Sequence, residues 1–263
     1  MPMELAPIAI EDGRHSPHVA RKRQARLRRI LATALAILRS EGRPALTLKA
    51  LGEQLDLTPA AIYRYFPSKD ALIAELQRVV IASLAAAASE RVACAEGLAR
   101  SARLGPRDRA LLAIVVSALV FESFARDAST EFGLLSSDLG RLEYALPARE
   151  AAQVFEMAWR ALGELAGRIE AAAKVGALVE GPGSERAIAL WAALQGVAQT
   201  RKLVRSAAGR IDPPRIARGV VGALLVGWGA VPARVERVMG FARERELAGS
   251  VPSALAWLEG PEP

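Results

Sequence analysis

Three side chains in one short segment, Ala60, Tyr63 and Arg64, have the types and spacing that suit contact with a nucleic acid. On a helix they share one face and present a methyl group, a phenolic hydroxyl and a guanidinium. Arginine can read guanine in the major groove, and a tyrosine hydroxyl can bond a phosphate. The alternative is an ordinary helical corner whose outer face is simply solvated.

The elements that must position these side chains are two short helices joined by a tight turn. Thr47 is a good N-cap for a helix that ends at Leu55, and Thr58 caps a second helix that begins with a proline and ends at Phe66. Ile62 and Phe66 are four residues apart and point toward the core. Two helices of this length with a turn of two or three residues form a helix-turn-helix pattern.

A long basic helix is predicted before this pattern, from about Pro17 to Glu41. Lys22, Arg26 and Arg29 follow one face of it. Another face carries an apolar stripe made by Ile30, Leu31, Ala34, Leu35 and Leu38.

Positive charge is concentrated in the same part of the chain. The whole chain of 263 residues has 35 basic and 28 acidic residues, a net charge of +7. Residues 14–69 hold 12 of the basic and 3 of the acidic residues, so they carry +9 and the remaining 207 residues carry −2. A basic head on a nearly neutral body is typical of proteins that bind polyanions, although a solubilising surface would look similar.

The segment from Thr47 to Leu76, TLKALGEQLDLTPAAIYRYFPSKDALIAEL, resembles the DNA-binding domain of the TetR/AcrR family of bacterial transcriptional regulators. The resemblance covers about 50 residues from Arg28. It rests on the threonine-capped helix, on a recognition helix ending in Tyr-x-x-Phe, and on the following Ser-Lys-Asp-x-Leu. Asp56 departs from the family, which usually has glycine in the turn. Aspartate tolerates the left-handed backbone that glycine would adopt there.

The resemblance implies roles for individual residues of the predicted interface. Ala60 and Arg64 would face bases. The residues that would touch phosphates or flank the groove are Thr47, Thr58, Tyr63, Tyr65 and Lys69. Lys69 also lies near the start of the next helix, whose N-terminus favours a phosphate. The basic arm made by Arg14, Arg21, Lys22 and Arg23 would reach a neighbouring minor groove, or else be a solvated leader.

The resemblance further implies that the C-terminal helices pair two subunits. The helix around Trp191 looks like the family's Trp-x-x-x-His-Gly helix with Gln195 in the histidine position. A two-fold interface made by residues 186–204 and 213–228 is expected, unless its tryptophans only fill a monomer core. Its predicted members are Trp191, Leu194, Gln195, Leu224, Leu225 and Trp228.

A pocket for a small effector is expected among helices at roughly 107–127 and 147–174. An apolar lining with a few polar groups is typical of ligand pockets and also of cores. The predicted lining consists of Phe121, Phe124, Phe132, Tyr144, Phe155, Met157 and Trp159, with Glu122, Gln153 and Glu156 as polar contacts. One more helix at 232–248 would cover this pocket or widen the dimer interface.

Enzyme and metal chemistry find little support in the composition. The chain has one cysteine, Cys94, and two histidines, His15 and His18, so neither a catalytic triad nor an ordinary Cys/His metal site is expected. No cofactor is expected. The longest charge-free stretch, residues 219–233, is too short to span a bilayer, so no membrane partner is expected. The first 20 residues lack an apolar segment of the secretory kind and the chain has a single cysteine, so the predicted location is the cytoplasm.

The sequence therefore predicts an all-α protein with a leader at 1–20 and a helix-turn-helix domain at 21–67. A connecting helix would follow at 68–90, and an effector-binding and dimerisation domain at 91–263. The leading hypothesis is a dimeric repressor that binds a palindromic operator on double-stranded DNA and is released by a small hydrophobic effector. The alternatives are a helical protein that binds DNA or a membrane surface without sequence preference, and an all-α enzyme.

Overall fold

A computed structural model describes residues 17–139, 146–200 and 212–248, and every regular element in these ranges is an α-helix. The predicted all-α fold is therefore confirmed. The helices are α1 (Pro17–Glu41), α2 (Leu48–Leu55), α3 (Pro59–Tyr63), α4 (Lys69–Ser101), α5 (Pro106–Asp127), α6 (Ser129–Leu139), α7 (Ala148–Lys174), α8 (Gly183–Gln199), α10 (Pro213–Gly227) and α11 (Pro232–Glu244).

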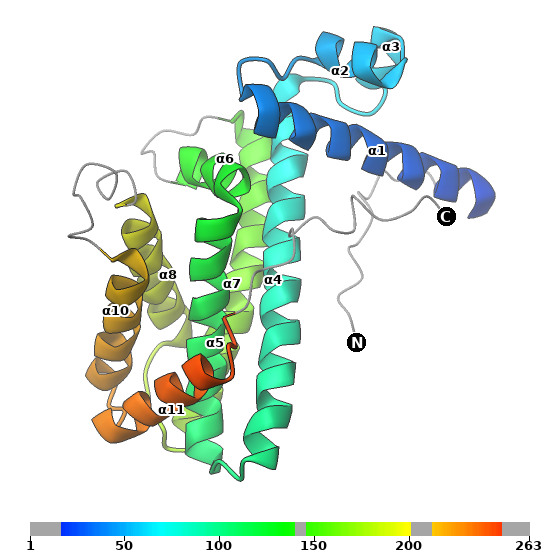
Figure 1. The fold of residues 1–263 in the computed structure, drawn as a ribbon. Helices are drawn as coiled ribbons and strands as arrows, with labels where there is room; N and C mark the ends of the chain where they lie inside the picture. The colour runs from blue at the N-terminus through cyan, green and yellow to red at the C-terminus, as the bar shows by residue number, and fades with distance from the viewer. Residues whose placement is uncertain (1–16, 140–145, 201–211, 249–263) are drawn as a thin grey trace.

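The first three helices form one end of the molecule (Figure 1). The apolar stripe predicted on α1 is buried, and so are Ile62 and Phe66, as predicted. All of these side chains belong to one hydrophobic core. Lys22, Arg26 and Arg29 are exposed on another face of α1. The basic side chains thus remain available on the outside while the apolar ones hold the three helices together.

The helix caps predicted for this end are confirmed. The Oγ1 atom of Thr47 accepts a hydrogen bond from the backbone N–H of Ala50 at 3.0 Å. The Oγ1 atom of Thr58 accepts one from the N–H of Ala61 at 3.3 Å. Asp56 between the two helices has φ 54° and ψ 43°, the left-handed conformation expected for the turn.

The recognition helix α3 is shorter than predicted. It ends at Tyr63 and not at Phe66, so the predicted end was wrong. The N–H groups of Tyr65 and Phe66 both bond to the carbonyl oxygen of Ile62, which closes the chain in a turn. Pro67 disfavours helical backbone in the residue before it, and this explains why the last predicted turn opens.

A close backbone approach fixes the angle between α2 and α3. The N–H of Leu57 donates to the carbonyl oxygen of Gly52 at 2.9 Å. A Cβ atom on Gly52 would lie only 2.8 Å from the carbonyl oxygen of Leu57. Glycine is therefore required inside α2, because any side chain would push the turn away from the helix.

The rest of the chain forms a bundle in which α4, α5 and α7 pack side by side (Figure 1). Helices α8 and α10 pack beside this group, and α11 crosses α5. Helix α4 continues to Ser101, beyond the expected 68–90, and includes the exposed Cys94. Gly97 lies inside α4 and Gly133 inside α6, and neither interrupts its helix.

Among the described residues, α4 alone has the length and apolar composition to cross a membrane. However, 61% of its most apolar window is buried inside the protein. Core helices of soluble proteins have the same property, so this helix is weak support for a membrane span.

Candidate nucleic-acid interface and ligand cleft

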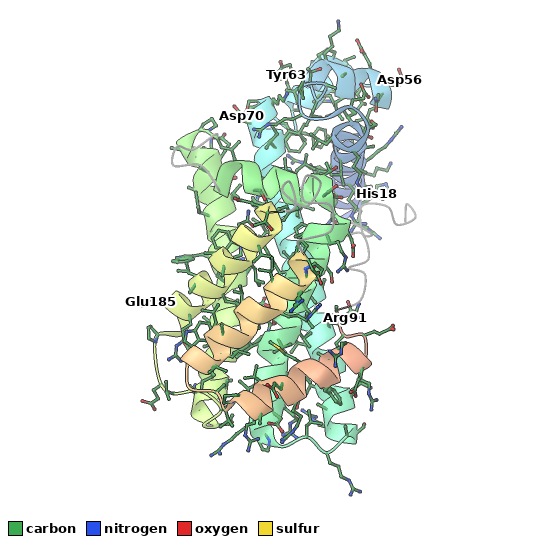
Figure 2. The ribbon with its side chains drawn as sticks, turned by 60° about the vertical axis from the view of Figure 1, so that its left-hand side comes forward. His18, Asp56, Tyr63, Asp70, Arg91 and Glu185 are labelled. Carbon is green, nitrogen blue, oxygen red and sulfur yellow. The ribbon has the colours of Figure 1, made fainter. Side chains whose placement is uncertain are left out.

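The predicted contact face of the recognition helix is exposed to solvent. Tyr63 is 55% exposed, and Ala60 and Arg64 are also exposed. Figure 2 shows Tyr63 and Asp56 together at the end of the molecule, far from Glu185 and Arg91 in the body. A large aromatic side chain standing in solvent beside a guanidinium can contact a partner without any rearrangement of the core.

The other predicted contacts surround this face. Thr47 and Thr58 are exposed, but their hydroxyl oxygens already accept the capping bonds, so their hydroxyl hydrogens remain for a phosphate. Tyr65 is half-buried and packs on the core. The ammonium of Lys69 donates to the carbonyl oxygen of Arg43 at 2.9 Å, which holds it beside the loop between α1 and α2.

The basic arm is only partly described. Arg21 and Lys22 are exposed on the first turns of α1, and Arg23 is half-buried. Arg14 lies outside the described residues. Exposed positive side chains therefore lie along α1 in the same end of the molecule, which suits the backbone of a nucleic acid.

A cleft of about 270 Å³ lies among α4, α5, α7 and α8. Phe121, Phe155 and Trp159 line it, as the sequence predicted, and Trp159 is 62% exposed at its edge. Trp191, predicted for a dimer interface, lines the same cleft. The remaining lining is mostly aliphatic and comes from all four helices and from Leu135 of α6.

The other predicted pocket residues lie elsewhere. Phe124 is fully buried in the core and packs edge-on against Phe132. Glu156 is exposed and pairs with Arg160, one turn along the outer face of α7. Gln153 is exposed and Met157 packs against the core, whereas Tyr144 lies outside the described residues. Helical periodicity alone does not predict which of the aromatic side chains on α5 and α7 face the cleft.

Glu122 lines a second cavity of about 240 Å³ between α5, α10 and α11. Its carboxylate also binds Arg126 at 3.0 Å. Ala118 and Leu194 line both cavities and form the wall between them. The sequence predicts that the helix at 232–248 either covers the predicted pocket or widens the dimer interface. Helix α11 does line a cavity, but it is this second cavity and not the cleft among α4, α5, α7 and α8.

Helix α11 is fixed across α5 by one buried carboxylate. Asp108 accepts hydrogen bonds from Arg234 at 2.7 Å and from Arg237 at 3.0 Å. The side chain of Asp108 is only 6% exposed. The two arginines compensate for the desolvation of this carboxylate, so it acts as an anchor for α11.

Several residues predicted for the dimer interface are buried within one subunit. Leu194 and Leu225 belong to the core, and the Gln195 amide donates to Ser136 Oγ of α6 at 2.9 Å. Leu224 and Trp228 are half-buried, and Arg186 lies 5.5 Å from the centre of the Trp228 ring. These side chains therefore stabilise the subunit itself.

Two polar groupings were missed by the sequence. Arg168 of α7 lies in the ligand cleft beside Ser117. Arg39 of α1 binds the buried Glu131 of α6, with a distance of 3.0 Å between Nε and Oε1. The first has a weak local signal, a Glu164–Arg168 pair four residues apart, but the second joins residues 92 positions apart and has none.

Comparisons with known proteins find relatives for the N-terminal part of the chain, which contains the helix-turn-helix. Residues 30–76 match the family model described as bacterial regulatory proteins, tetR family. Uncharacterized HTH-type transcriptional regulators of Mycobacterium bovis and Mycobacterium tuberculosis are 41% identical over 64 residues, 24% of this chain. The match spans only 30% of the length of those curated relatives, less than a third.

The fold is shared over most of the chain with solved structures. One is a bacterial regulatory protein in the tetR family from Rhodococcus, with 18% identity and a TM-score of 0.52 over 78% of this chain and 97% of that one. Another is the Thermus thermophilus repressor FadR in complex with lauroyl-CoA, with 17% identity and a TM-score of 0.53 over 78% of this chain and 95% of that one. At these identities the likeness concerns the fold alone.

Proposed function

We propose that the protein is a transcriptional regulator of the tetR family, whose model residues 30–76 match, and that it acts as a repressor in the cytoplasm. It binds a palindromic operator as a homodimer and is released by a small hydrophobic effector. The observation that carries the proposal is the exposed face of Ala60, Tyr63 and Arg64 on a capped helix-turn-helix. Tyr63 stands 55% exposed on this face, where its ring and hydroxyl are accessible to a partner.

The surface of α8 and α10 supports the homodimer. Ala189, Ala192 and Gly196 are exposed along one face of α8. On α10, Ile216, Gly219, Ala223 and Val226 are exposed along one face. A Cβ atom on Gly196 or Gly219 would meet no atom within 4 Å, so the subunit itself does not need these glycines. Small side chains at helical spacing allow two helix pairs to approach closely across a two-fold axis.

Helix α6 supports a connection between the ligand cleft and the DNA-binding end. Leu135 of α6 lines the cleft, and Glu131, one turn earlier, binds Arg39 of α1. The Gln77 amide of α4 donates to the carbonyl oxygen of Leu134 at 2.9 Å. A ligand that moves α6 would therefore act on α1 and α4 together. Coupling of 1–3 kcal/mol, typical of such systems, would lower operator affinity about 5- to 150-fold.

The test is a footprint of the purified protein on the DNA upstream of its own gene, at two salt concentrations. A dimer should protect a palindrome whose half-sites are about one helical turn, roughly 34 Å, apart. Diffuse protection that disappears at the higher salt would leave a basic protein without sequence preference and would refute the proposal.

Two variants make the footprint specific for the proposed face. Tyr63→Ala should weaken binding to every DNA sequence, because the lost contact is to phosphate. Arg64→Ala should lower operator affinity by about 1–3 kcal/mol and also relax the preference at one base pair. Arg160→Ala, on the exposed outer face of α7, is the matched control and should bind like the parent. Unchanged binding by both variants would remove this face from the interface.

A further inference from the structure

One group of polar side chains interrupts the apolar lining of the ligand cleft. Ser117 of α5 and Glu164 and Arg168 of α7 line the cleft, and no other charged side chain is among its described lining residues. Around them the wall is aliphatic or aromatic. A ligand in the cleft would therefore contact charged side chains at one place only. These side chains determine which polar or charged group of a ligand can bind there.

Arg168 is held rigidly at this place. Its Nη2 donates to Ser89 Oγ of α4 at 2.7 Å, and its Nη1 donates to Ser117 Oγ at 3.3 Å. Ser117 in turn donates to the carbonyl oxygen of Ala113 at 2.7 Å, which orients its hydroxyl. Three helices thus fix the guanidinium, and its side chain is only 17% exposed. Holding the group in advance reduces the entropy that a ligand must lose on binding.

The positive charge of Arg168 is paired with one carboxylate, that of Glu164, through a long hydrogen bond. Glu164 Oε2 lies 3.4 Å from Nη2, and the same oxygen accepts a shorter bond of 2.7 Å from Ser89. Glu164 is also the more exposed of the two side chains, at 34%. Burial lowers the pKa of Arg168, although the charge of Glu164 and its hydrogen bond act in the opposite direction. A largely buried cation whose single carboxylate partner is shared with a serine is stabilised further by a second anion.

We propose, on the basis of the function proposed above, that the effector is an apolar monocarboxylic acid whose carboxylate binds Arg168. Its apolar body lies against the aromatic side chains of the cleft, chiefly Phe121, Trp159 and Trp191. A guanidinium presents several N–H donors in a planar fork that matches a carboxylate. An alcohol can accept fewer of these bonds, and an ammonium group would be repelled.

The test is calorimetric titration of the full chain with two matched series of probes. The first series is decanoate, 1-decanol and decylammonium, and the second is 1-naphthoate and 1-naphthol. We expect the acid of at least one series to bind about tenfold or more tightly than its neutral analogue, as for a hydrogen bond to a charged group. Decylammonium should bind more weakly than 1-decanol.

Three variants separate the role of Arg168 from general packing. R168Q should lose about tenfold of acid affinity or more, with the affinity for the neutral analogue changed less than about twofold. E164Q removes the competing anion and should strengthen acid binding a fewfold. R160Q changes an exposed arginine two turns earlier on α7 and should behave like the parent, which controls for the positive net charge. If circular dichroism shows that R168Q does not fold, the increase in acid affinity expected for E164Q still tests the proposal.

Equal binding of acids and neutral analogues in both series would overturn the proposal, as would acid binding that R168Q and E164Q leave unchanged. Repeating the titrations at two protein concentrations checks whether a second subunit covers the cleft, and an apparent affinity that falls with protein concentration would also overturn it. The footprint without ligand is measured on the same preparation. Loss of the footprint therefore indicates failure of the proposed function, whereas a normal footprint with no preference for acids indicates failure of this inference.

Discussion

At the scale of single residues, the helix-turn-helix depends on the backbone of Asp56. Its φ of 54° lies in the left-handed region, which is unfavourable for residues with a Cβ atom and worst for β-branched ones. We expect the free energy of unfolding of Asp56→Gly to lie within about 0.5 kcal/mol of that of the parent, and that of Asp56→Val to be lower by about 1–2 kcal/mol. Urea unfolding followed by circular dichroism measures both. Equal stability of the two variants would mean that the turn relaxes to another conformation.

The residue-level features that the sequence predicts well are local ones. Thr47 and Thr58 accept hydrogen bonds from N–H groups three positions along the chain, and Asp56 determines the turn through its own backbone angles. The local sequence is therefore enough to predict their roles. Gly52 does not, because the atom that excludes its Cβ belongs to Leu57 beyond the turn. For the same reason the sequence did not single out Arg168, whose serine partners lie on two other helices.

At the scale of helices, the pair between Arg39 of α1 and Glu131 of α6 joins the DNA-binding end to the body. Glu131 is almost fully buried, whereas Arg39 is 38% exposed. Arg39→Ala would leave a buried carboxylate with its main partner removed. We expect it to lower the free energy of unfolding by about 1–3 kcal/mol, less than for a pair buried on both sides.

A matched surface pair controls for the loss of any arginine. Arg100 is 69% exposed and binds Glu96 within α4. Arg100→Ala should change the free energy of unfolding by less than about 1 kcal/mol. A similar effect of the two substitutions in urea unfolding would show that α1 and α6 do not depend on the buried pair.

A largely buried glutamate in the N-terminal part of α4 gives a prediction about pH. Burial raises the pKa of Glu75, although Arg78, whose Nη1 lies 2.6 Å from Glu75 Oε2, lowers it in part. Between the unfolded pKa of 4.5 and the raised folded pKa, the folded protein binds a proton that the unfolded chain has lost. Stability from this group is therefore present at low pH and is lost as pH rises through that interval.

The measurement compares the parent with Glu75→Gln from pH 4 to pH 7. The free energy of unfolding of the parent, relative to the variant, should fall as the pH rises. Thermal or urea unfolding at four pH values is sufficient. A parent that gains stability relative to the variant over this interval would mean that Arg78 dominates over burial.

The lengths of the helices show where local signals end. Helix α1 begins and ends as predicted, because its basic face and apolar stripe follow the helical period up to Glu41. Helices α4 and α6 continue through Gly97 and Gly133 although glycine is a poor helix former, since packing against α5 and other neighbours stabilises them. The choice of which face of α5 and α7 lines the cleft also depends on packing, so only part of the predicted lining was right.

At the scale of the whole molecule, α4 and α6 reach from the proposed ligand cleft to the end of the molecule that carries the recognition helix. Helix α4 begins beside α2 and α3 and contributes Ile81 and Leu84 to the ligand cleft farther along. Helix α6 contributes Leu135 to the cleft and Glu131 to the contact with α1. A displacement of either helix by a ligand would thus change the position of the recognition helix relative to the bundle. In a dimer the bundle fixes the distance between the two recognition helices, so this displacement changes the fit to two half-sites.

This argument requires that α8 and α10 hold the dimer, and one substitution tests it. Ala223 is exposed in the middle of the small-residue face of α10, so Ala223→Glu would place two like charges near the two-fold axis without disturbing the subunit. Sedimentation should show a monomer, and operator affinity should fall at least about tenfold because each subunit then binds one half-site. Ala93→Glu, on the exposed side of α4, is the matched control and should remain dimeric with the parent footprint. A dimer that survives Ala223→Glu would place the interface on another surface and would separate the motion of α6 from the spacing of the recognition helices.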